Sequence, residues 1–371
     1  MQILPVSDSK TKKEFLDLAR YIYQDDENWI CPLDDDINSI FNADKNPFFK
    51  HGSCERWLLK ENGKLIGRVA AFINDKKAYQ YDQPTGGMGF FECIDDEAAA
   101  FLLFDTAKNW LSEKGMEAMD GPINFGENDS YWGLLVEGFT PPSYGMNYHK
   151  LYYKAFFESY GFTTAYEQIT NHLQIRNPFP ERFTKIANWV ANKPGYTFEY
   201  FSKKNSEKYV NDLMEIYNDA WTDFENFVPI KKETLQESFK KMEAIMDEKL
   251  IWFAYINGEP ASFVVIIPDA NQLIKGFNGE LGWIEKAKFV YRRWKGVNRM
   301  RAIVMGTKSA YQKHGLESAL FIKLKEYVLP LNQYDELELS WVGDFNDKML
   351  SLHQATGATF GKRHLTLRKI F

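Results

Sequence analysis

The sequence is short of cysteine, of long apolar runs and of net positive charge. Its three cysteines, Cys31, Cys54 and Cys93, are odd in number and form no CxxC, so neither a disulfide framework nor a cysteine metal site is expected. The longest apolar stretch, 261–268, is too short to cross a bilayer, and the first residues lack the apolar run of a signal peptide. A net charge of −6 argues against a nucleic-acid partner. We therefore expect a cytoplasmic protein with no bound metal.

Apolar and aromatic residues, by contrast, are plentiful. Hydrophobic residues make up 44% of the chain and aromatic residues 16%. At 371 residues the chain is longer than one ordinary domain, so we expect two domains, each with its own packed core. The high aromatic share suits either large cores or a long apolar groove.

The two halves of the sequence carry the same pattern. An Asn-Gly pair lies between apolar segments at 62–63 and again at 257–258, 195 residues later, and Asn-Gly is a strong hairpin signal. Three further pairs of segments match in the same order: 2–6 with 197–201, 10–23 with 206–221, and 153–162 with 349–358. Four matches in order indicate an internal duplication. We therefore divide the chain into halves at 1–175 and 196–371, joined by a linker at 176–195 with a helix at 181–192.

One stretch of the second half suits a bound anion. The apolar run 300–305 predicts a buried strand that Gly306 ends, and apolar residues from Leu316 onward recur at helical spacing. The intervening loop therefore leads into a helix N-terminus, which offers unpaired N–H groups and a partial positive charge. Gly315, just before this helix, lets a ligand approach the backbone. A diphosphate fits such a place.

The loop Gln312-x-x-Gly315 resembles the acyl-CoA pyrophosphate loop of the GNAT (Gcn5-related N-acetyltransferase) superfamily, although Glu317 stands where that family usually has Gly or Ala. Segment 346–358 resembles the family's closing motif, with His353 in the place of a Tyr that often protonates the departing thiolate. The order of elements in each half also matches. The resemblance implies an α/β (α+β) fold of two tandem GNAT-like domains, each a mixed twisted sheet flanked by helices.

The resemblance also implies an acyl-CoA-dependent N-acyltransferase, with acetyl-CoA or a longer acyl-CoA as donor. The donor contacts that it implies are Val304, Met305, Gln312, Lys313, His314, Gly315, Leu316, Glu317, Ser318 and Asn346. A backbone N–H near Val304 or Met305 is expected to hold the oxyanion. His353 is the expected acid, and Glu338 or Ser340, on a predicted strand at 336–342, is the expected base acting through water. The plainer alternatives are a solvent-facing His353 and a surface carboxylate at Glu338.

The first half is predicted to be closed to the donor. Asp95, Asp96 and Glu97 stand where a phosphate loop would lead into a helix, and carboxylates there satisfy the helix N–H groups. Phe157 takes the place of the family's Tyr. We therefore expect a degenerate half that serves the acceptor.

A long segment of the first half, 121–147, either folds over the acceptor site or merely packs against the second half. Its candidate substrate contacts are Asn124, Asn128, Trp132, Tyr144 and Asn147. Both a small-molecule amine and a lipid amine are compatible with this sequence as the acceptor. The acidic run 34–36 is expected to be a solvated loop.

The second half carries an insertion, 269–299, in which aromatic and basic residues interleave. Four interpretations stay open: an amphipathic helix with a solvated face, a peripheral membrane contact, a contact to the 3′-phosphate of coenzyme A, and a cover for a fatty chain. The departures at Phe157, Glu317 and His353 leave a second function open, that of a non-catalytic acyl-CoA-binding protein. Transfer from aminoacyl-tRNA would need a basic face, against which the overall acidity argues.

Overall fold

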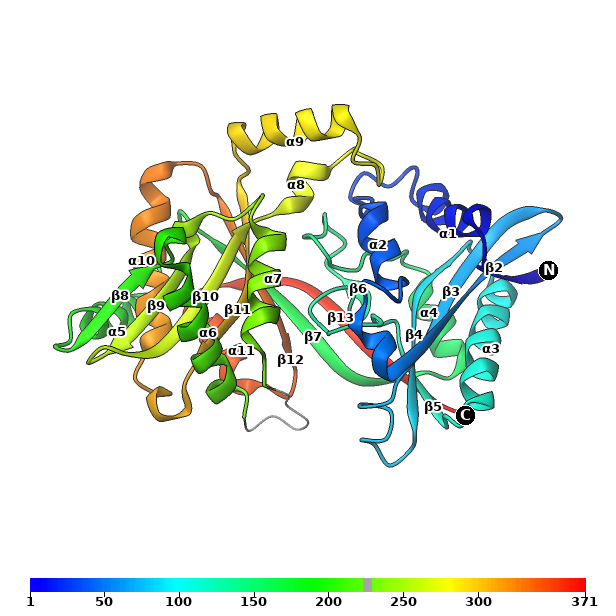
Figure 1. Ribbon diagram of the computed structural model, residues 1–371, viewed down its shortest axis with the longest axis horizontal. Coiled ribbons are helices and arrows are strands. Elements are labelled where there is room, and N and C mark those ends of the chain that lie inside the picture. Colours follow the sequence, from blue (N-terminus) through cyan, green and yellow to red (C-terminus); the bar gives the residue numbers. More distant parts are fainter. Residues whose placement is uncertain (223–228) are drawn as a thin grey trace.

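The computed structural model describes residues 1–222 and 229–371. It shows two α/β halves side by side, each with strands between helices (Figure 1). The strands are β1 (Gln2–Pro5), β2 (Gly52–Glu61), β3 (Lys64–Asn74), β4 (Thr85–Cys93), β5 (Ala118–Gly121), β6 (Leu134–Glu137), β7 (Thr163–Gln174), β8 (Tyr196–Tyr200), β9 (Ile251–Ile256), β10 (Glu259–Pro268), β11 (Arg299–Thr307), β12 (Glu336–Gly343) and β13 (Thr359–Ile370).

The helices follow the duplicated order that the sequence predicts. They are α1 (Ser9–Ile22), α2 (Asp34–Ile40), α3 (Glu97–Glu113), α4 (Tyr153–Tyr160), α5 (Glu181–Ala191), α6 (Ser206–Ala220), α7 (Lys232–Met242), α8 (Ala270–Ile274), α9 (Trp283–Lys295), α10 (Leu316–Leu331) and α11 (Asp347–Ala355). Within the described ranges, none of them has both the length and the apolar composition that crossing a bilayer requires.

The two predicted hairpins are present at β2–β3 and β9–β10. Asn62 and Gly63 have φ values of 48° and 79°, and Asn257 and Gly258 have φ values of 52° and 87°. Both residues of each turn therefore lie in the left-handed region that a type I′ turn requires, and Asn and Gly occupy that region most easily. The hairpin signal read from the sequence is confirmed in both halves.

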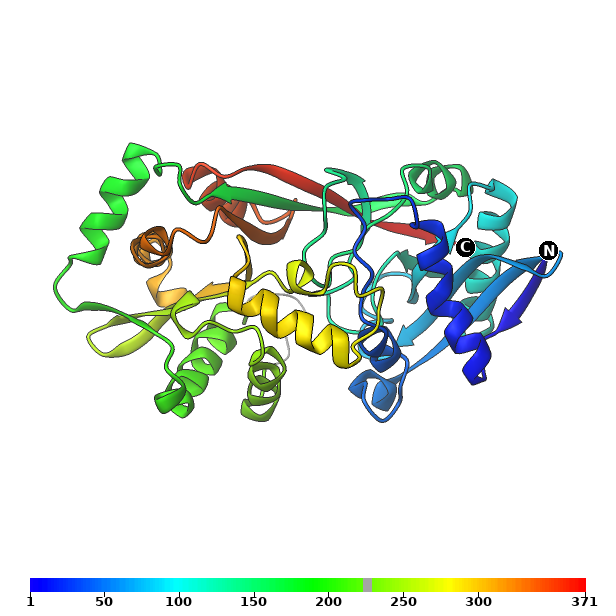
Figure 2. The ribbon, with the colours of Figure 1, turned by 90° about the horizontal axis from the view of Figure 1, so that it is seen from above.

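The strands form a single sheet in the order β1-β2-β3-β4-β5-β13-β7-β12-β11-β10-β9-β8, with β6 beside β13. The last strand of each half is paired with strands of the other half. β7, from the first half, pairs with β12 of the second, whereas β13, from the end of the chain, pairs with β5 and β6 of the first. The two exchanged strands also pair with each other and run side by side across the molecule (Figure 2). The predicted mixed sheets are thus two parts of one continuous sheet.

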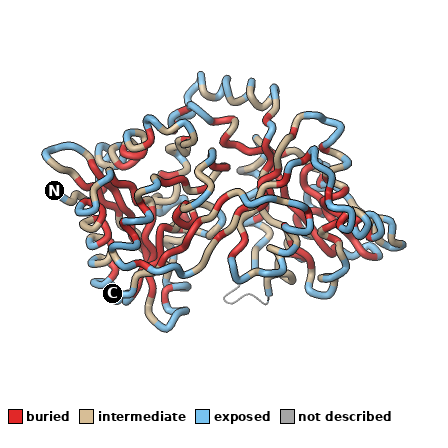
Figure 3. Tube along the Cα trace, turned by 180° about the vertical axis from the view of Figure 1, so that it is seen from behind, coloured by how far each residue is buried: buried red, intermediate tan, exposed pale blue. Residues whose placement is uncertain are grey.

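Each half has a core on both faces of its strands, because strand residues alternate between the faces. In the first half, α3 and α4 cover one core and α1 covers the other. In the second half, α5 and α10 cover one core, and α6 and α7 cover the other. Buried segments accordingly gather in both halves and continue through the strands between them (Figure 3).

The acidic run at 34–36 is not the solvated loop that we expected, because it begins α2. Asp34 forms an ion pair with Arg20, and Asp36 accepts a hydrogen bond from the Tyr144 hydroxyl at 2.5 Å. These partners lie far away in the sequence, so local composition gave no sign of them.

The strand exchange predicts that the halves stay together when the linker is cut. A protease site inserted between Asn177 and Pro178 lies in an exposed turn, so cleavage there should leave the sheet intact. We expect the two fragments to co-elute on native gel filtration and to separate only in denaturant, because β7 and β13 each pair with strands of the opposite half. The uncut protein with the same insertion is the control. Fragments that separate without denaturant would contradict the observed pairing.

Candidate active site at the junction of the halves

The parallel strands β11 and β12 pair over only three residues of each and then part. The last pair joins Arg301 to Glu338. Just beyond it, the Ser340 hydroxyl lies 2.5 Å from the carbonyl oxygen of Ala302 and 2.7 Å from that of Ile303. Ser340, a predicted base, therefore uses its hydroxyl to satisfy the backbone of β11 where the ladder hydrogen bonds end.

The helix that follows β11 begins without a side-chain cap. Its N-cap is Gly315, with φ of +75°, which has no side chain to accept a hydrogen bond from the first-turn N–H groups. A Cβ at this position would lie 3.1 Å from Val190 of α5, so the linker helix packs closely there as well. The carboxylate of Glu317 turns back and accepts a hydrogen bond from the Thr307 hydroxyl at 2.7 Å. The N-terminus of α10 thus keeps its partial positive charge.

Side chains of the neighbouring loop contact the surrounding elements. The Gln312 side chain accepts a hydrogen bond from Lys348, and the His314 ring stacks on Tyr196 with a hydrogen bond of 2.9 Å. Lys313 is exposed. The other predicted donor contacts occupy different places: Leu316 and Ser318 are buried in the first turn of α10, Val304 and Met305 are half-buried on β11, and Asn346 caps α11 through the Met349 N–H.

In the first half, the corresponding helix N-terminus and strand ends are already hydrogen-bonded within the protein. Asp96 caps α3 by accepting a hydrogen bond from the Ala99 N–H at 3.0 Å. Beyond the last parallel pair of β4 and β5, the Ile123 N–H donates to the Met88 carbonyl at 2.9 Å, so the segment after β5 closes the gap between these strands. These bonds use the groups that a bound diphosphate or amide chain would need.

Two tyrosines complete the closure of the first half. The Tyr153 hydroxyl accepts from the Cys93 N–H, and the Tyr152 hydroxyl donates to the Cys93 carbonyl, both at 2.9 Å. In the duplicated alignment these tyrosines correspond to Lys348 and Met349, neither of which has a hydroxyl. Phe157, the counterpart of His353, is buried in the core.

His353 faces inward. It is 4% exposed, and its Nδ1 lies 3.1 Å from the side-chain nitrogen of Asn171. Burial lowers the pKa of His353 to about 4, so the ring is neutral near pH 7. The alternative of a solvent-facing helix residue is therefore wrong.

A row of polar side chains crosses the sheet where the halves meet, and we call it the polar seam. It consists of Gln168, Thr170 and His172 on β7, Glu338 on β12, and Lys362, His364 and Thr366 on β13. Gln168 is registered with His364 and Thr170 with Lys362, so they share a face of the sheet. Apart from His172, which is partly covered, every member is buried.

Glu338 is the electrostatic centre of the seam. It is 1% exposed, so it is not a surface carboxylate. Its carboxylate lies 3.6 Å from Nε2 of His172 and 3.9 Å from Nε of Arg301. Burial alone would raise the pKa of Glu338, but His172, followed by the charge of Lys362, outweighs burial and lowers the pKa to about 2. Glu338 is thus a buried anion among cations and a weak base.

His172 is held between two carboxylates. Its Nδ1 lies 2.9 Å from Glu336, and its Nε2 faces Glu338. Burial alone would lower the pKa of His172, but the two carboxylates outweigh burial and raise it above the ordinary value of 6.5. A histidine whose pKa is raised above its ordinary value therefore stands directly beside the point where β11 and β12 part.

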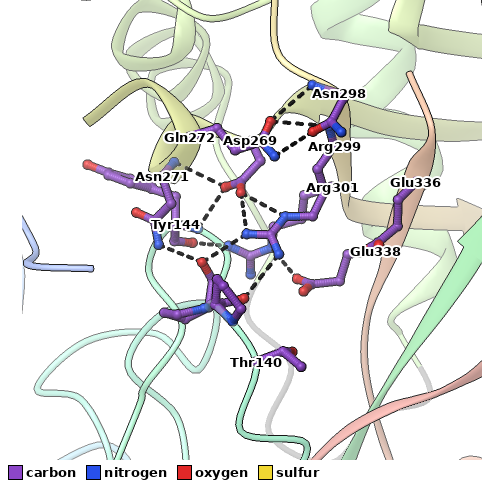
Figure 4. Close-up of polar contacts among 12 residues, drawn as sticks. Thr140, Tyr144, Asp269, Asn271, Gln272, Asn298, Arg299, Arg301, Glu336 and Glu338 are labelled. Atoms are coloured by element: carbon purple, nitrogen blue, oxygen red, sulfur yellow. Dashed lines mark hydrogen bonds and ion pairs between the residues drawn. The ribbon is translucent and has the colours of Figure 1, made fainter. Parts of the chain in front are cut away.

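The segment 121–147 packs over the seam and binds to the second half. Arg299 pairs with Asp269 at 2.6 Å and donates to the carbonyl oxygens of residues 141 and 142, each at 3.0 Å (Figure 4). Arg301 donates to the Tyr144 carbonyl, and Thr140 accepts from the Lys362 ammonium at 2.6 Å. The segment thus packs against the second half and covers the polar seam, and its role over an acceptor site stays a prediction.

Several polar atoms beneath the segment 121–147 have no hydrogen-bond partner among the described residues. They are the indole N–H of Trp132, the Thr170 hydroxyl, Nδ1 of His364 and the side-chain nitrogen of Gln168. The Trp132 ring lies 5.9 Å from the His364 ring, centroid to centroid. Buried polar groups are normally satisfied by protein, water or ligand. The seam therefore offers donors and acceptors that the described chain does not itself use.

The residues predicted to contact the substrate lie in three different parts of the structure. Trp132 lies beside the seam, whereas Asn124 and Asn128 line a cavity of about 170 Å³ in the first half. The Tyr144 hydroxyl donates to Asp36 of α2, and the Asn147 side chain donates to the Gly133 carbonyl within the segment 121–147. His172 and Lys362 were not predicted as site residues from the sequence. Their signal is the high polar content of two strand segments, with four polar residues of five at 168–172 and four of five at 362–366.

Comparisons with known proteins add the following. No family model matches the chain. A tandem GNAT protein from the clavulanic acid biosynthesis pathway superposes with a TM-score of 0.60 at 12% identity, over 99% of this chain and 98% of that one. A GCN5-related N-acetyltransferase from Sphaerobacter thermophilus gives a TM-score of 0.54 at 10% identity, over 99% and 95%. The chain has the tandem GNAT fold.

Two sequences are also similar to this tandem GNAT chain over nearly its full length. Bacterial ceramide synthase of Caulobacter vibrioides is 29% identical over 385 residues, which cover 100% of this chain and 97% of that protein. Protein YghO of Escherichia coli is 29% identical over 366 residues, which cover 96% and 92%. The resemblance drawn from the loop and the closing motif is confirmed at the level of the fold.

Removing the central carboxylate should destabilise the protein. Glu338→Gln leaves His172 and Lys362 without their buried anion, so we expect a loss of about 3–5 kcal/mol in the free energy of unfolding at pH 7, measured with urea. Because the pKa of Glu338 falls from 4.5 to about 2 on folding, its contribution should persist above pH 4.5 and fade as the pH falls toward 2. The exposed Glu199→Gln is the control. Equal stability of both variants at pH 7 would contradict this electrostatic centre.

Proposed function

We propose that this tandem GNAT chain is an acyl-CoA-dependent N-acyltransferase whose second half binds the donor. The observation that carries the proposal is the contrast between two duplicated helix N-termini: Asp96 caps α3, whereas α10 starts on Gly315 without a cap. A diphosphate is stabilised by free N–H groups and the partial positive charge of a helix end. Lys313, exposed just before α10, adds a positive charge.

The geometry of the strands also favours the second half as the one that binds the donor. β11 and β12 part beyond Arg301, and the hydroxyls of Tyr152 and Tyr153 that occupy the equivalent strand end in the first half have no counterpart in the second. An extended amide chain such as that of coenzyme A can hydrogen-bond to β11 beyond the two carbonyl groups that Ser340 occupies. In the proposal, Val304 or Met305 supplies the N–H that holds the oxyanion.

We further propose that the acceptor is a lipid amine and the donor a long-chain acyl-CoA. Ceramide is the amide of a fatty acid and a sphingoid base, and one sequence similar to this chain over its whole length is a bacterial ceramide synthase. A sphingoid base combines an amine and hydroxyl groups with an apolar tail. The unused polar atoms of Thr170 and His364 in the seam, and of Trp132 beside it, suit such a polar head.

His172 is the proposed base. The acceptor's ammonium gives one proton to His172, and the imidazolium that forms is stabilised by Glu336 and Glu338. The free amine then attacks the thioester carbon, the carbon–sulfur bond breaks, and the thiolate leaves. The nitrogen loses its second proton as the amide forms, and this proton passes to the thiolate. Glu338, whose pKa is about 2, positions His172 and does not accept the proton itself.

In the proposal, His353 is a hydrogen-bond donor to the leaving group and not the acid that the sequence predicts. With Nδ1 accepting from Asn171, the neutral ring carries its proton on Nε2. Such an N–H can donate a hydrogen bond to the departing sulfur, but it is not the strong acid that an imidazolium would be. His353 therefore stabilises the thiolate, and the proton comes from the reacting nitrogen.

One observation favours the second function, acyl-CoA binding without catalysis. His353, which stands in the place of the family's acid Tyr, is buried and neutral near pH 7, and Glu338 is an anion with a pKa of about 2. Neither predicted residue is therefore an effective acid or base for the transfer. Release of free coenzyme A in the presence of an amine distinguishes a transferase from a protein that only binds acyl-CoA.

A thiol-release assay tests the transferase. Acyl-CoAs of increasing length are combined with sphingoid bases and short amines, and we expect release of free coenzyme A with a long-chain amine. Lys313→Glu should raise the KM for the donor about tenfold with little change in kcat, because it reverses a charge beside the diphosphate. Lys64→Glu, an equally exposed lysine at the β2–β3 turn, is the control. Donor binding without thiol release across the panel supports the binding protein instead.

The base assignment predicts a pH profile. Because His172 acts in its neutral form, kcat/KM should rise with pH through a midpoint above 6.5. His172→Gln should lower kcat about 100-fold. Glu336→Gln should move the midpoint toward lower pH, because it removes a carboxylate that raises the pKa of His172. The exposed Glu181→Gln is the control. An unchanged midpoint in Glu336→Gln would remove His172 from this role.

A further inference from the structure

Helix α9 carries its apolar residues on the outside of the molecule. Trp283 is 92% exposed and Trp294 is 81% exposed, and the helix contains no buried residue. Trp283, Ala287, Val290, Tyr291 and Trp294 recur at the spacing of one helix face and together line one shallow surface. We call this face the α9 stripe. An amphipathic helix of a globular protein normally turns such a face toward the core.

The inner face of α9 is firmly attached, so its orientation is fixed. Arg292 donates to the carbonyl oxygens of Leu273 and Lys275, both at 2.7 Å, and Arg293 donates to that of Met246 at 3.3 Å. Phe289 packs against the buried cores beneath. The helix lies along the outer edge of the molecule, and its position above the junction of the halves is visible in Figure 1. The α9 stripe is therefore presented outward by specific contacts on the opposite side.

Positive charge flanks the stripe. The helix has five basic residues and one acidic residue in a chain whose net charge is −6. Lys286, Lys288 and Lys295 are exposed, and among the described residues none of the three has an ion-pair partner. Lysines in such positions extend their charge to the headgroup level, while Trp and Tyr favour the boundary between water and lipid.

We propose that the α9 stripe docks on an anionic lipid bilayer, with the helix lying in the plane of the membrane surface. Exposed aromatic residues supply the apolar contact, and the three free lysines supply the attraction to acidic headgroups. A second copy of the chain is a poorer occupant, because pairing two α9 helices would bring the three exposed lysines of each copy together, and each helix has only one carboxylate. The proposal concerns where the protein resides and does not depend on its catalytic activity.

Vesicle sedimentation of the full-length protein tests the proposal. The probes are phosphatidylcholine vesicles with and without phosphatidylglycerol. We expect partitioning at least about tenfold stronger with the anionic lipid and weaker binding as salt is added. Trp283→Ala with Trp294→Ala should reduce binding at least about tenfold. Trp189→Ala, a 65% exposed tryptophan on α5, is the matched control.

Reversing the charge of the exposed lysines of α9 provides a second test. Lys286→Glu, Lys288→Glu and Lys295→Glu together should abolish the preference for anionic vesicles. The control reverses three other exposed lysines, Lys12, Lys45 and Lys64. Circular dichroism checks that each variant is folded. The proposal is overturned if the wild type does not bind anionic vesicles or if the α9 variants bind as well as their controls. A dimer that the Trp283 and Trp294 changes dissolve would overturn it in favour of a second copy.

Discussion

The exchange of β7 and β13 is the constraint on which the rest of the structure depends. Each strand completes the sheet of the half to which it does not belong in sequence. Their mutual pairing brings Gln168 opposite His364 and Thr170 opposite Lys362. The polar seam is therefore built from residues that are almost two hundred positions apart. Neither half could form it alone, which gives a physical reason for the two units to remain in one chain.

Duplication followed by divergence explains how one fold holds two different surfaces. In the first half, Asp96 and the hydroxyls of Tyr152 and Tyr153 occupy the backbone groups at the end of the parallel strands. In the second half, Gly315 leaves the same helix end uncapped. A few polar substitutions thus decide whether a helix N-terminus is satisfied internally or is available to an anion. The segment 121–147 then links the altered half to the second half through Arg299 and Asp269.

The sequence predicts what is local. The Asn-Gly hairpins, the repeated order of elements and the loop before α10 follow from turn chemistry and periodicity, and all are present. The strand exchange was not predictable in this way, because the mostly polar segments 163–174 and 359–370 carry no apolar pattern that specifies a partner strand. For the same reason, the burial of Glu338 and its contact with His172 were missed. Periodicity likewise identifies the two faces of α9 but not which of them points outward.

The separation of β13 from β5 along the sequence has a consequence for synthesis. β5 lies between β4 and β13, so one edge of the first half lacks its neighbour until β13, at Thr359–Ile370, has emerged from the ribosome. An uncovered strand edge is a template for pairing with other chains. The nascent first half therefore has an open edge while the whole segment between β5 and β13 is made, and a ribosome that stalls within this segment would leave a fragment prone to aggregation.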